Sequence, residues 1–248
     1  MIVTQKVTKY FQSFAAVREV SFTIPAGEIV GFLGQNGAGK TTLMRILASF
    51  LPASSGRVFI DGEDLARHSL SCRAKIGYLP ETPPLYTNMT VEDYLRFAAE
   101  IKGVPVKQRR IRLDKVLAEC QLTAVRQKVI GTLSKGYKQR VGIAQAIVHE
   151  PRILILDEPT SGLDPIQVLQ VRALIKDLRH QRTVLLSTHI LSEIEQIAHR
   201  VLIMRDGQLI VDGPLGSLLG APGPGRPGGA TLEEAFVNCH QARPEGAP

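Results

Sequence analysis

The chain alternates between short apolar runs and stretches in which apolar residues recur every three or four positions. Short apolar runs bounded by turn-forming residues predict β-strands. The predicted strands are Ile2–Val7, Val20–Ile24, Ile29–Leu33, Arg57–Asp61, Lys75–Leu79, Ile153–Leu156, Thr183–Ser187, Val201–Met204 and Gln208–Val211. Apolar positions at helical spacing predict helices between several of these strands. The predicted helices are Thr42–Leu51, Val91 to about Leu122, Gln139–Val148, Pro165–Arg179 and Leu191–Ala198.

The order of these elements predicts the fold class. Beyond residue 150, strands and helices alternate, which predicts a mainly parallel sheet with helices on both faces. The N-terminal strands and a hairpin that turns at Asp206 add an antiparallel portion. We therefore expect an α/β core of residues 1–84 and 150–212, with an inserted α-helical subdomain at residues 85–149.

After the hairpin the composition of the chain changes. Gly and Pro dominate from Gly213 to Gly229, which predicts a linker. Leu232, Ala235 and Phe236 then follow at helical spacing and predict a short docking helix. Residues 213–248 are thus expected to form a linker and a short C-terminal helix outside the core.

Composition narrows the class of protein. Hydrophobic residues make up 44% and charged residues 21%, which is typical of a soluble globular chain. The longest apolar runs, such as Ile153–Leu156, are far shorter than the about 18 residues that span a bilayer, and no signal-peptide pattern is present. The 3 cysteines form no CxxC pair, so neither a disulfide framework nor a zinc site is expected. These features predict a cytoplasmic location.

The charge balance is basic, with 30 Lys and Arg against 23 Asp and Glu, and a net charge of +7. Such a balance can attract nucleic acid, anionic lipid or nucleotide. The densest basic run, between Lys107 and Lys115, is interleaved with aliphatic rather than aromatic residues. This pattern predicts a solvated helix face, with phospholipid headgroups as the alternative, and no nucleic-acid partner.

A glycine-rich loop is the first candidate for chemistry. Residues 34–41 read GQNGAGKT, which fits G-x-x-x-x-G-K-[ST], and they stand between an apolar strand and an amphipathic helix. Backbone N–H groups of such a loop bind phosphate oxygens, Lys40 reaches the β and γ phosphates, and Thr41 holds Mg²⁺. The predicted nucleotide-binding residues here are Gly34, Asn36, Gly37, Ala38, Gly39, Lys40, Thr41 and Thr42. The core is thus expected to be a P-loop NTPase that uses ATP and Mg²⁺.

A second candidate stands at the end of the strand Ile153–Leu156. Asp157 and Glu158 follow this strand directly. A hydrolase of this class needs a carboxylate for the metal ion and a group that orients the attacking water. We expect Asp157 to bind Mg²⁺, directly or through water, and Glu158 to polarise the water.

Three further segments carry a family resemblance. Residues 133–140 read LSKGYKQR and resemble the LSGGQ signature of the ATP-binding cassette (ABC) ATPases. Residues 160–164, TSGLD, resemble the loop that follows the metal-binding strand in that family, and Ser187-Thr188-His189 resembles its switch-histidine segment. The resemblance runs from about Ile2 to Gly213.

The resemblance implies a two-chain active site. Two cassettes would face each other head to tail, so that ATP lies between one phosphate loop and Ser134 and Gly136 of the partner. His189 would contact the γ phosphate and act in catalysis with Glu158 and Lys40. Asp164 would link the two sites. Tyr10 would stack on adenine, with Phe11 as the alternative.

Two departures from the family pattern stand out. Residues 77–81 read GYLPE, and Glu81 occupies the position where the family usually has Gln. An ionised Glu cannot donate a hydrogen bond but can accept one or coordinate a metal, so we expect Glu81 to act as a metal or water ligand. The signature carries Lys135 and Tyr137 at its second-glycine and glutamine positions, while Ser134 and Gly136 are retained.

The resemblance implies the ATPase subunit of a membrane transporter, peripheral on the inner face of the cell membrane. A separate integral membrane permease and a second ATPase subunit, in a homodimer, would complete it. The sequences of residues 77–81 and 133–140 are similar to those of a bacterial branch that includes gliding-motility and sodium-export cassettes, and this similarity favours export. The alternative is a soluble ABC ATPase that acts on the ribosome or DNA. The chain has a single cassette, a short helical insert and no CxxC pair, and these features count against the soluble alternative. A P-loop phosphotransferase would have no use for the signature or His189.

Overall fold

The computed structural model describes residues 1–178, 182–219 and 231–241. Its strands are β1 Ile2–Phe11, β2 Phe14–Ile24, β3 Ile29–Gly34, β4 Ser55–Ile60, β5 Glu63–Asp64, β6 Ile76–Leu79, β7 Ile153–Asp157, β8 Thr183–Ser187, β9 Arg200–Arg205 and β10 Gln208–Pro214. Its α-helices are α1 Lys40–Leu47, α2 Ser69–Ala74, α3 Val91–Ile101, α4 Val106–Glu119, α5 Lys135–Ile147, α6 Pro165–Leu178, α7 Leu191–Ile197, α8 Leu215–Leu218 and α9 Leu232–Gln241. Two 3₁₀ turns, Thr123–Val125 and Ile130–Thr132, stand between α4 and α5.

Two sheets form the α/β part of the molecule. The six-stranded sheet has the order β10-β9-β3-β8-β7-β6, and only its edge strand β10 pairs antiparallel. The four-stranded sheet, β2-β1-β4-β5, is antiparallel throughout. The prediction of a mainly parallel sheet with an antiparallel portion is confirmed.

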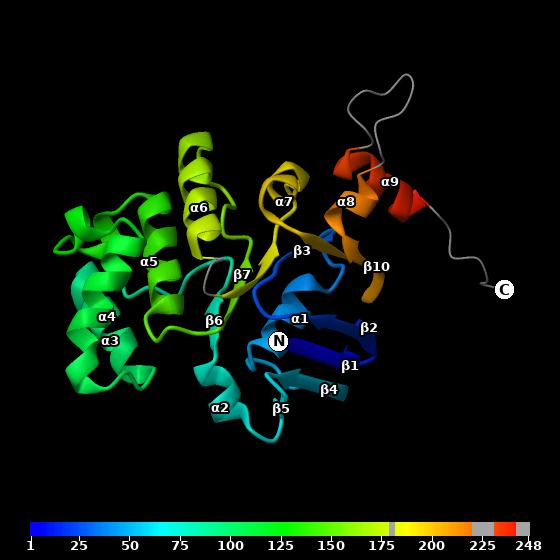
Figure 1. Cartoon of the computed structure of the whole chain (residues 1–248), viewed down its shortest axis with the longest axis horizontal. Helices are drawn as coiled ribbons and strands as arrows, with labels where there is room; N and C mark the ends of the chain where they lie inside the picture. Colours follow the sequence, from blue (N-terminus) through cyan, green and yellow to red (C-terminus); the bar gives the residue numbers. More distant parts are fainter. Residues whose placement is uncertain (179–181, 220–230, 242–248) are drawn as a thin grey trace.

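Alternate residues of the central strands enter two different hydrophobic clusters, as the two-residue period of a strand requires. In β7, Leu154 and Leu156 pack with helices α6 and α7, whereas Ile153 and Ile155 pack with α1 and the antiparallel sheet. Figure 1 shows α6 and α7 on one side of the parallel sheet and α1 on the other. Strands buried on both faces read as continuous apolar runs, which is why β7 was recognisable in the sequence.

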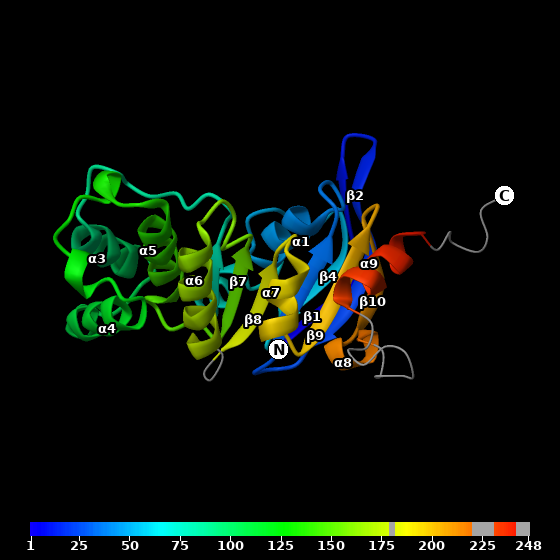
Figure 2. The same ribbon diagram turned by 90° about the horizontal axis from the view of Figure 1, so that it is seen from above.

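Helices α3, α4 and α5 lie together at one end of the molecule, away from β1, β2 and β4 (Figures 1 and 2). The prediction of one helical stretch from Val91 to about Leu122 is wrong in one respect, because the chain breaks it between Ile101 and Val106. Gly103 has a φ of 74°, a left-handed conformation that ends α3, and Pro105 then caps the start of α4.

Other helix boundaries also differ from expectation. Helix α1 ends at Leu47 rather than Leu51, because Ser49 adopts a φ of 61°. Phe50 therefore leaves the predicted apolar face and is 68% exposed. Helix α5 begins at Lys135, four residues earlier than the predicted Gln139, and α2 was not predicted. A helix of 6 residues is too short for its spacing to be recognised.

The C-terminal docking helix is present as α9, and its Leu232 is completely buried. The start of the predicted linker instead belongs to β10 and to the short helix α8. The remainder of that linker, at residues 220–229, lies outside the described residues.

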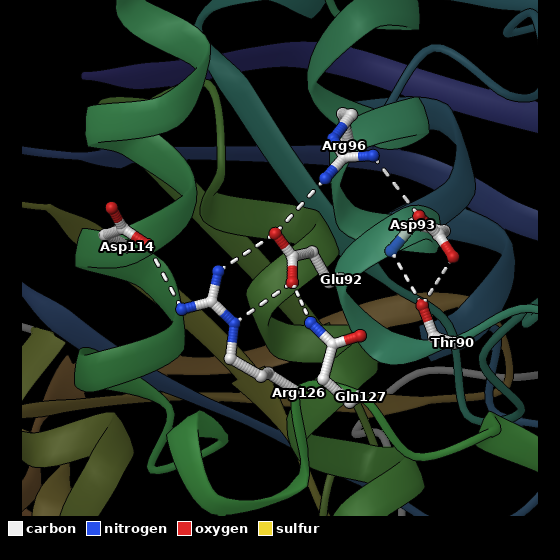
Figure 3. Close-up of polar contacts among 7 residues, drawn as sticks. All are labelled: Thr90, Glu92, Asp93, Arg96, Asp114, Arg126 and Gln127. Atoms are coloured by element: carbon white, nitrogen blue, oxygen red, sulfur yellow. Dashed lines mark hydrogen bonds and ion pairs between the residues drawn. The ribbon is translucent and has the colours of Figure 1, made fainter.

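A polar network joins the start of α3 to the segment that leads to the signature residues (Figure 3). Thr90 caps α3 by accepting a hydrogen bond from the backbone N–H of Asp93 at 3.1 Å. The Glu92 carboxylate accepts hydrogen bonds from Arg126 at 2.9 and 3.0 Å, and also from Gln127. These bonds fix the chain shortly before Ser134.

Candidate functional site

The glycine-rich loop connects β3 to α1 and requires glycine at two of its positions. Gly34 and Gly39 have φ values of 153° and 100°. A Cβ atom on Gly34 would stand 2.6 Å from the carbonyl oxygen of Met204, and one on Gly39 would stand 2.3 Å from that of Ala16. Both approaches are too close for any side chain. The loop therefore keeps its backbone N–H groups at the N-terminus of α1, where anions are favoured.

Lys40 is the first residue of α1 and is only 7% exposed. Its ammonium group donates hydrogen bonds to the carbonyl oxygens of Gly34 at 2.5 Å and Gln35 at 3.1 Å. Burial lowers the pKa of Lys40, while the nearby carboxylates of Glu158 and Asp157 oppose that shift. The loop thus holds a buried ammonium group, which favours an anion, beside two acids, which favour a cation.

The residues expected to hold the metal ion lie close together. The hydroxyl of Thr41 is 3.4 Å from Oδ1 of Asp157, and the hydroxyl of Ser187 donates to the same oxygen at 2.7 Å. Oδ2 of Asp157 is buried and has no hydrogen-bond partner among the described residues. A buried, unpaired carboxylate oxygen beside a hydroxyl fits a divalent cation.

Nowhere in the described part of the chain, this site included, do three or more His, Cys, Asp and Glu side chains form a group that could hold a metal. Mg²⁺ commonly binds through one or two carboxylates together with phosphate oxygens, rather than in an all-protein cage. The pair Thr41 and Asp157 is compatible with such a site.

Glu158 and His189 face each other across the ends of β7 and β8. The ring Nδ1 of His189 is 2.7 Å from Oε2 of Glu158. The backbone N–H of Glu158 donates to the carbonyl of Ser187 at 3.2 Å and to its hydroxyl at 3.0 Å. Glu158 has a φ of 48°, so this backbone is held in a sparsely populated conformation, as is common at functional sites.

One cavity of about 520 Å³ collects most of the expected residues. They are Asn36, Gly37, Gly39, Lys40, Thr41, Thr42, Glu81, Glu158 and His189. Gly34 lines an adjoining cavity with Asn36 and His189, and Ala38 is buried in the loop. Asp157 lies beneath the main cavity and is 1% exposed. The ends of three parallel strands thus bring phosphate-binding, metal-binding and acid–base groups to one place.

The aromatic residues of this cavity differ from the sequence-based expectation. Phe11 and Phe14 line it, and Tyr10 does not. Neighbouring residues of a strand point to opposite faces, so Tyr10 and Phe11 cannot both face the phosphate loop. Phe14 was not predicted as a cavity residue, because its pairing with Phe11 across the β1–β2 hairpin depends on the register of the two strands. The aromatic residues on both sides of the hairpin turn were the sequence signal that could have indicated it.

The signature residues lie in a different place. Ser134 caps α5, and its hydroxyl accepts a hydrogen bond from the N–H of Tyr137 at 3.4 Å. A Cβ atom on Gly136 would stand 2.7 Å from the side chain of Gln167. Ser134, Gly136 and Asp164 line a second cavity of about 490 Å³ that shares no residue with the phosphate-loop cavity. Within one chain, therefore, these three residues do not join the phosphate loop.

The fold and the first cavity define an ATPase of the P-loop class. Comparison with known proteins specifies the family. Residues 17–161 match the ABC transporter family, and the chain belongs to this family. The match includes the phosphate loop, the signature segment, Asp157 and Glu158.

Individual relatives agree with this assignment. The chain is 40% identical over 220 residues to the bacitracin transport ATP-binding protein BcrA of Bacillus licheniformis, covering 88% of this chain and 71% of that protein. An ATP-binding subunit of an ABC transporter shares the fold with a TM-score of 0.84 and 30% identity, over 97% of this chain and 100% of its own. A dimeric ATP-binding cassette with ADP and Pi, in a post-hydrolysis state, has a TM-score of 0.78 and 26% identity, over 87% and 99%.

The chain is therefore an ATP-binding, ATP-hydrolysing subunit of an ABC transporter. The predicted family, fold class and enzymatic activity are confirmed. The alternative of a soluble ATPase that acts on the ribosome or DNA is not favoured by these relatives. None of the helices in the described residues is long and apolar enough to cross a membrane.

Proposed function

We propose that the chain pairs head to tail with a second ATPase subunit, and that ATP hydrolysis between them drives export through a separate integral membrane permease. The separation of the two cavities carries this proposal. Ser134 is exposed at the N-terminus of α5, and Gly136 lines the same cavity although it is buried, so this helix N-terminus could bind phosphate of a nucleotide held by another chain. Residues 85–149 would be the subdomain that presents this signature, while residues 1–84 and 150–212 hold the nucleotide.

Within one half-site, each side chain has a role that its position supports. Thr41 and Asp157 would hold Mg²⁺, which when bound neutralises charge on the phosphate oxygens. Lys40 would bind the β and γ phosphates. Glu158 would accept a proton from the attacking water, and His189 would orient it beside the γ phosphate. Glu81 would serve as a further metal or water ligand, since it lines the same cavity.

Phe11 and Phe14 are better placed than Tyr10 to stack on the adenine ring. Both phenyl rings line the phosphate-loop cavity and are 46% and 61% exposed, so a flat base can stack on them. Asp164 lines the signature cavity and would connect the two half-sites across the dimer.

Export, and a place on the inner face of the cell membrane, are further parts of this proposal, and the relatives support the role in transport. BcrA is named as a bacitracin transport protein, and at 40% identity it supports a related role here. Dimer formation is supported by the dimeric cassette bound to ADP and Pi. A homodimer is the simplest arrangement, because one chain carries both halves of the site.

The dimer can be tested with the Glu158→Gln variant, which keeps the nucleotide-binding groups but removes the base. We expect size-exclusion chromatography with Mg²⁺ and ATP to shift this variant to twice the monomer mass. With ADP in place of ATP, the Glu158→Gln variant should elute as a monomer. The parental chain should also return to the monomer once it has consumed the ATP. A Glu158→Gln chain that stays monomeric at saturating ATP would contradict the two-chain site.

The transporter role requires a second experiment on membranes. Tagged full-length chain, purified from detergent-solubilised membranes, should recover an integral membrane protein in fixed stoichiometry. Recovery with ribosomes or DNA, and without any membrane protein, would instead support the soluble alternative.

A further inference from the structure

A buried carboxylate lies behind the catalytic pair. Glu193, in helix α7, is 2% exposed, yet it belongs to none of the motifs in the sequence. Its Oε2 atom accepts a hydrogen bond from the Thr160 hydroxyl at 2.8 Å and another from the Thr188 hydroxyl at 3.0 Å. Both threonines are also buried, at 4% and 0% exposure. One oxygen thus joins two loops that are far apart in the sequence.

These two loops carry the catalytic residues. Thr160 stands two residues after Glu158, and Thr188 directly precedes His189. On the cavity side, Glu158 and His189 approach each other at 2.7 Å. On the buried side, the Glu193 carboxylate ties the same two segments together. The separation of the catalytic pair is therefore set from both sides, and one of them is inaccessible to solvent.

The charge of Glu193 has a single nearby counterpart among the described residues. NH2 of Arg172, in α6, is 3.7 Å from Oε1 of Glu193, which itself accepts no hydrogen bond. Arg172 also donates to Gln196 of α7. Burying an ion pair of imperfect geometry costs free energy that apolar packing would not. The buried Glu193 carboxylate is therefore better explained by a role in positioning its neighbours than by a contribution to stability.

The local backbone supports the same view. The Thr188 hydroxyl also accepts a hydrogen bond from the N–H of Ile190 at 3.1 Å, so it fixes the backbone on both sides of His189. Glu158 is held with φ at 48°, a conformation that surrounding contacts must maintain.

We propose that Glu193 is a positioning residue, which holds the Glu158 and His189 loops at the separation that hydrolysis requires. It does not touch the nucleotide, and it acts through Thr160 and Thr188. The inference rests on the catalytic roles proposed for Glu158 and His189 and on hydrolysis in the proposed two-chain site, but not on the identity of the permease or the substrate. It predicts an effect on turnover rather than on ATP binding.

The test measures ATP hydrolysis by the full-length chain, with kcat expressed per nucleotide-binding site counted by titration with a fluorescent ATP analogue. Unfolded protein then does not contribute. We expect Glu193→Ala to lower kcat about 10- to 100-fold, since a misplacement of about 1 Å can cost about 100-fold. KM for ATP should stay within about twofold, since the phosphate loop is untouched. The control Glu195→Ala removes a carboxylate from the same helix that accepts a hydrogen bond from the N–H of Leu232 and none from the Glu158 or His189 loops among the described residues, and should leave kcat unchanged.

Conservative variants separate positioning from simple stabilisation. Glu193→Gln retains an oxygen that can accept from both threonines and should recover most of the turnover lost in Glu193→Ala. If Glu193→Ala does not fold, Thr188→Val tests the same bond, with Thr188→Ser as its control. Glu193→Ala or Thr188→Val with parental kcat, or a loss of kcat and ATP binding in proportion, would overturn the proposal. If Glu158→Gln left hydrolysis intact, the catalytic role proposed for Glu158 would be wrong, whatever the result for Glu193.

Discussion

The phosphate-loop region and the signature region both include a helix N-terminus, but their residues are brought together in different ways. Lys40 begins α1, whereas Asp157 and Glu158 stand at the end of β7, and the ends of buried parallel strands bring these two segments together. Ser134 and Gly136 instead stand at the start of one helix, and their contacts are with neighbouring residues and with α6. The first region is assembled by the fold of one chain. In the proposed dimer, the second is completed by another chain.

This difference determines what a substitution can change. In the phosphate-loop region, charged groups are buried beside one another, so the loss of one leaves the others uncompensated. In the signature region, the exposed groups contribute a helix cap and a surface. Substitutions there should affect the partner's nucleotide more than the chain's own.

The largest effect is expected from Lys40→Ala. Loss of the buried ammonium group removes about 2–4 kcal/mol of charge-assisted phosphate binding, which weakens the Kd for ATP about 30- to 1,000-fold. Isothermal titration of the monomer with Mg²⁺ and ATP measures this. Lys135→Ala, one lysine of the signature region, is the matched control and should leave the monomer's Kd unchanged. Equal losses in both variants would break the comparison.

Most residues that line the phosphate-loop cavity could be located from the sequence, because they lie in short contiguous patterns. Lys40 and Thr41 follow a recognisable loop, and Asp157 and Glu158 end a continuous apolar strand. Phe14 and Glu193 were missed, because neither belongs to a contiguous motif. The position of Phe14 depends on the register of the β1–β2 hairpin, and that of Glu193 on the packing of α7 against two loops.

Backbone conformation explains most of the errors at helix ends. The breaks at Ser49 and Gly103 depend on left-handed residues, and serine at such a position gives no signal in a sequence. Glycine and proline do give one, and the pair Gly103 and Pro105 marks a boundary that apolar spacing alone concealed. Local patterns thus identify elements, whereas tertiary contacts decide where they end.

A smaller effect is expected from Ser134→Ala. Loss of the N-cap should cost about 1 kcal/mol, equivalent to about 2–4 °C in Tm, while the monomer's Kd for ATP is unchanged. In a Glu158→Gln background, however, the variant should no longer form an ATP-dependent dimer in size-exclusion chromatography. Thr132→Ala removes a nearby hydroxyl that, among the described residues, donates to the carbonyl of Val129, and should preserve the dimer. Weaker ATP binding by the Ser134→Ala monomer would show that the two regions are not independent.

The smallest effect is expected from Arg126→Ala, which removes the ion pair with Glu92 shown in Figure 3. The hydrogen bond from Arg126 lowers the pKa of Glu92, so the pair stabilises the fold above the usual Glu pKa and this contribution is lost as the pH falls through the lowered value. Surface pairs contribute little, and we expect a loss of less than about 3 °C in Tm at pH 7. The loss should shrink on acidification in thermal melts.

The same variant sharpens the comparison, because it loosens the signature region without touching the signature. Backbone bonds remain, from the N–H of Val91 to the carbonyl of Lys128 at 3.1 Å and from that of Ile130 to Met89 at 2.9 Å. These should hold Ser134 in place, so Arg126→Ala in a Glu158→Gln background should still dimerise with ATP. Arg96→Ala, which removes a more exposed contact to Glu92, is the control. If Arg126→Ala abolished the dimer while ATP still bound, the side-chain network rather than the backbone pairing would be what presents the signature to the partner.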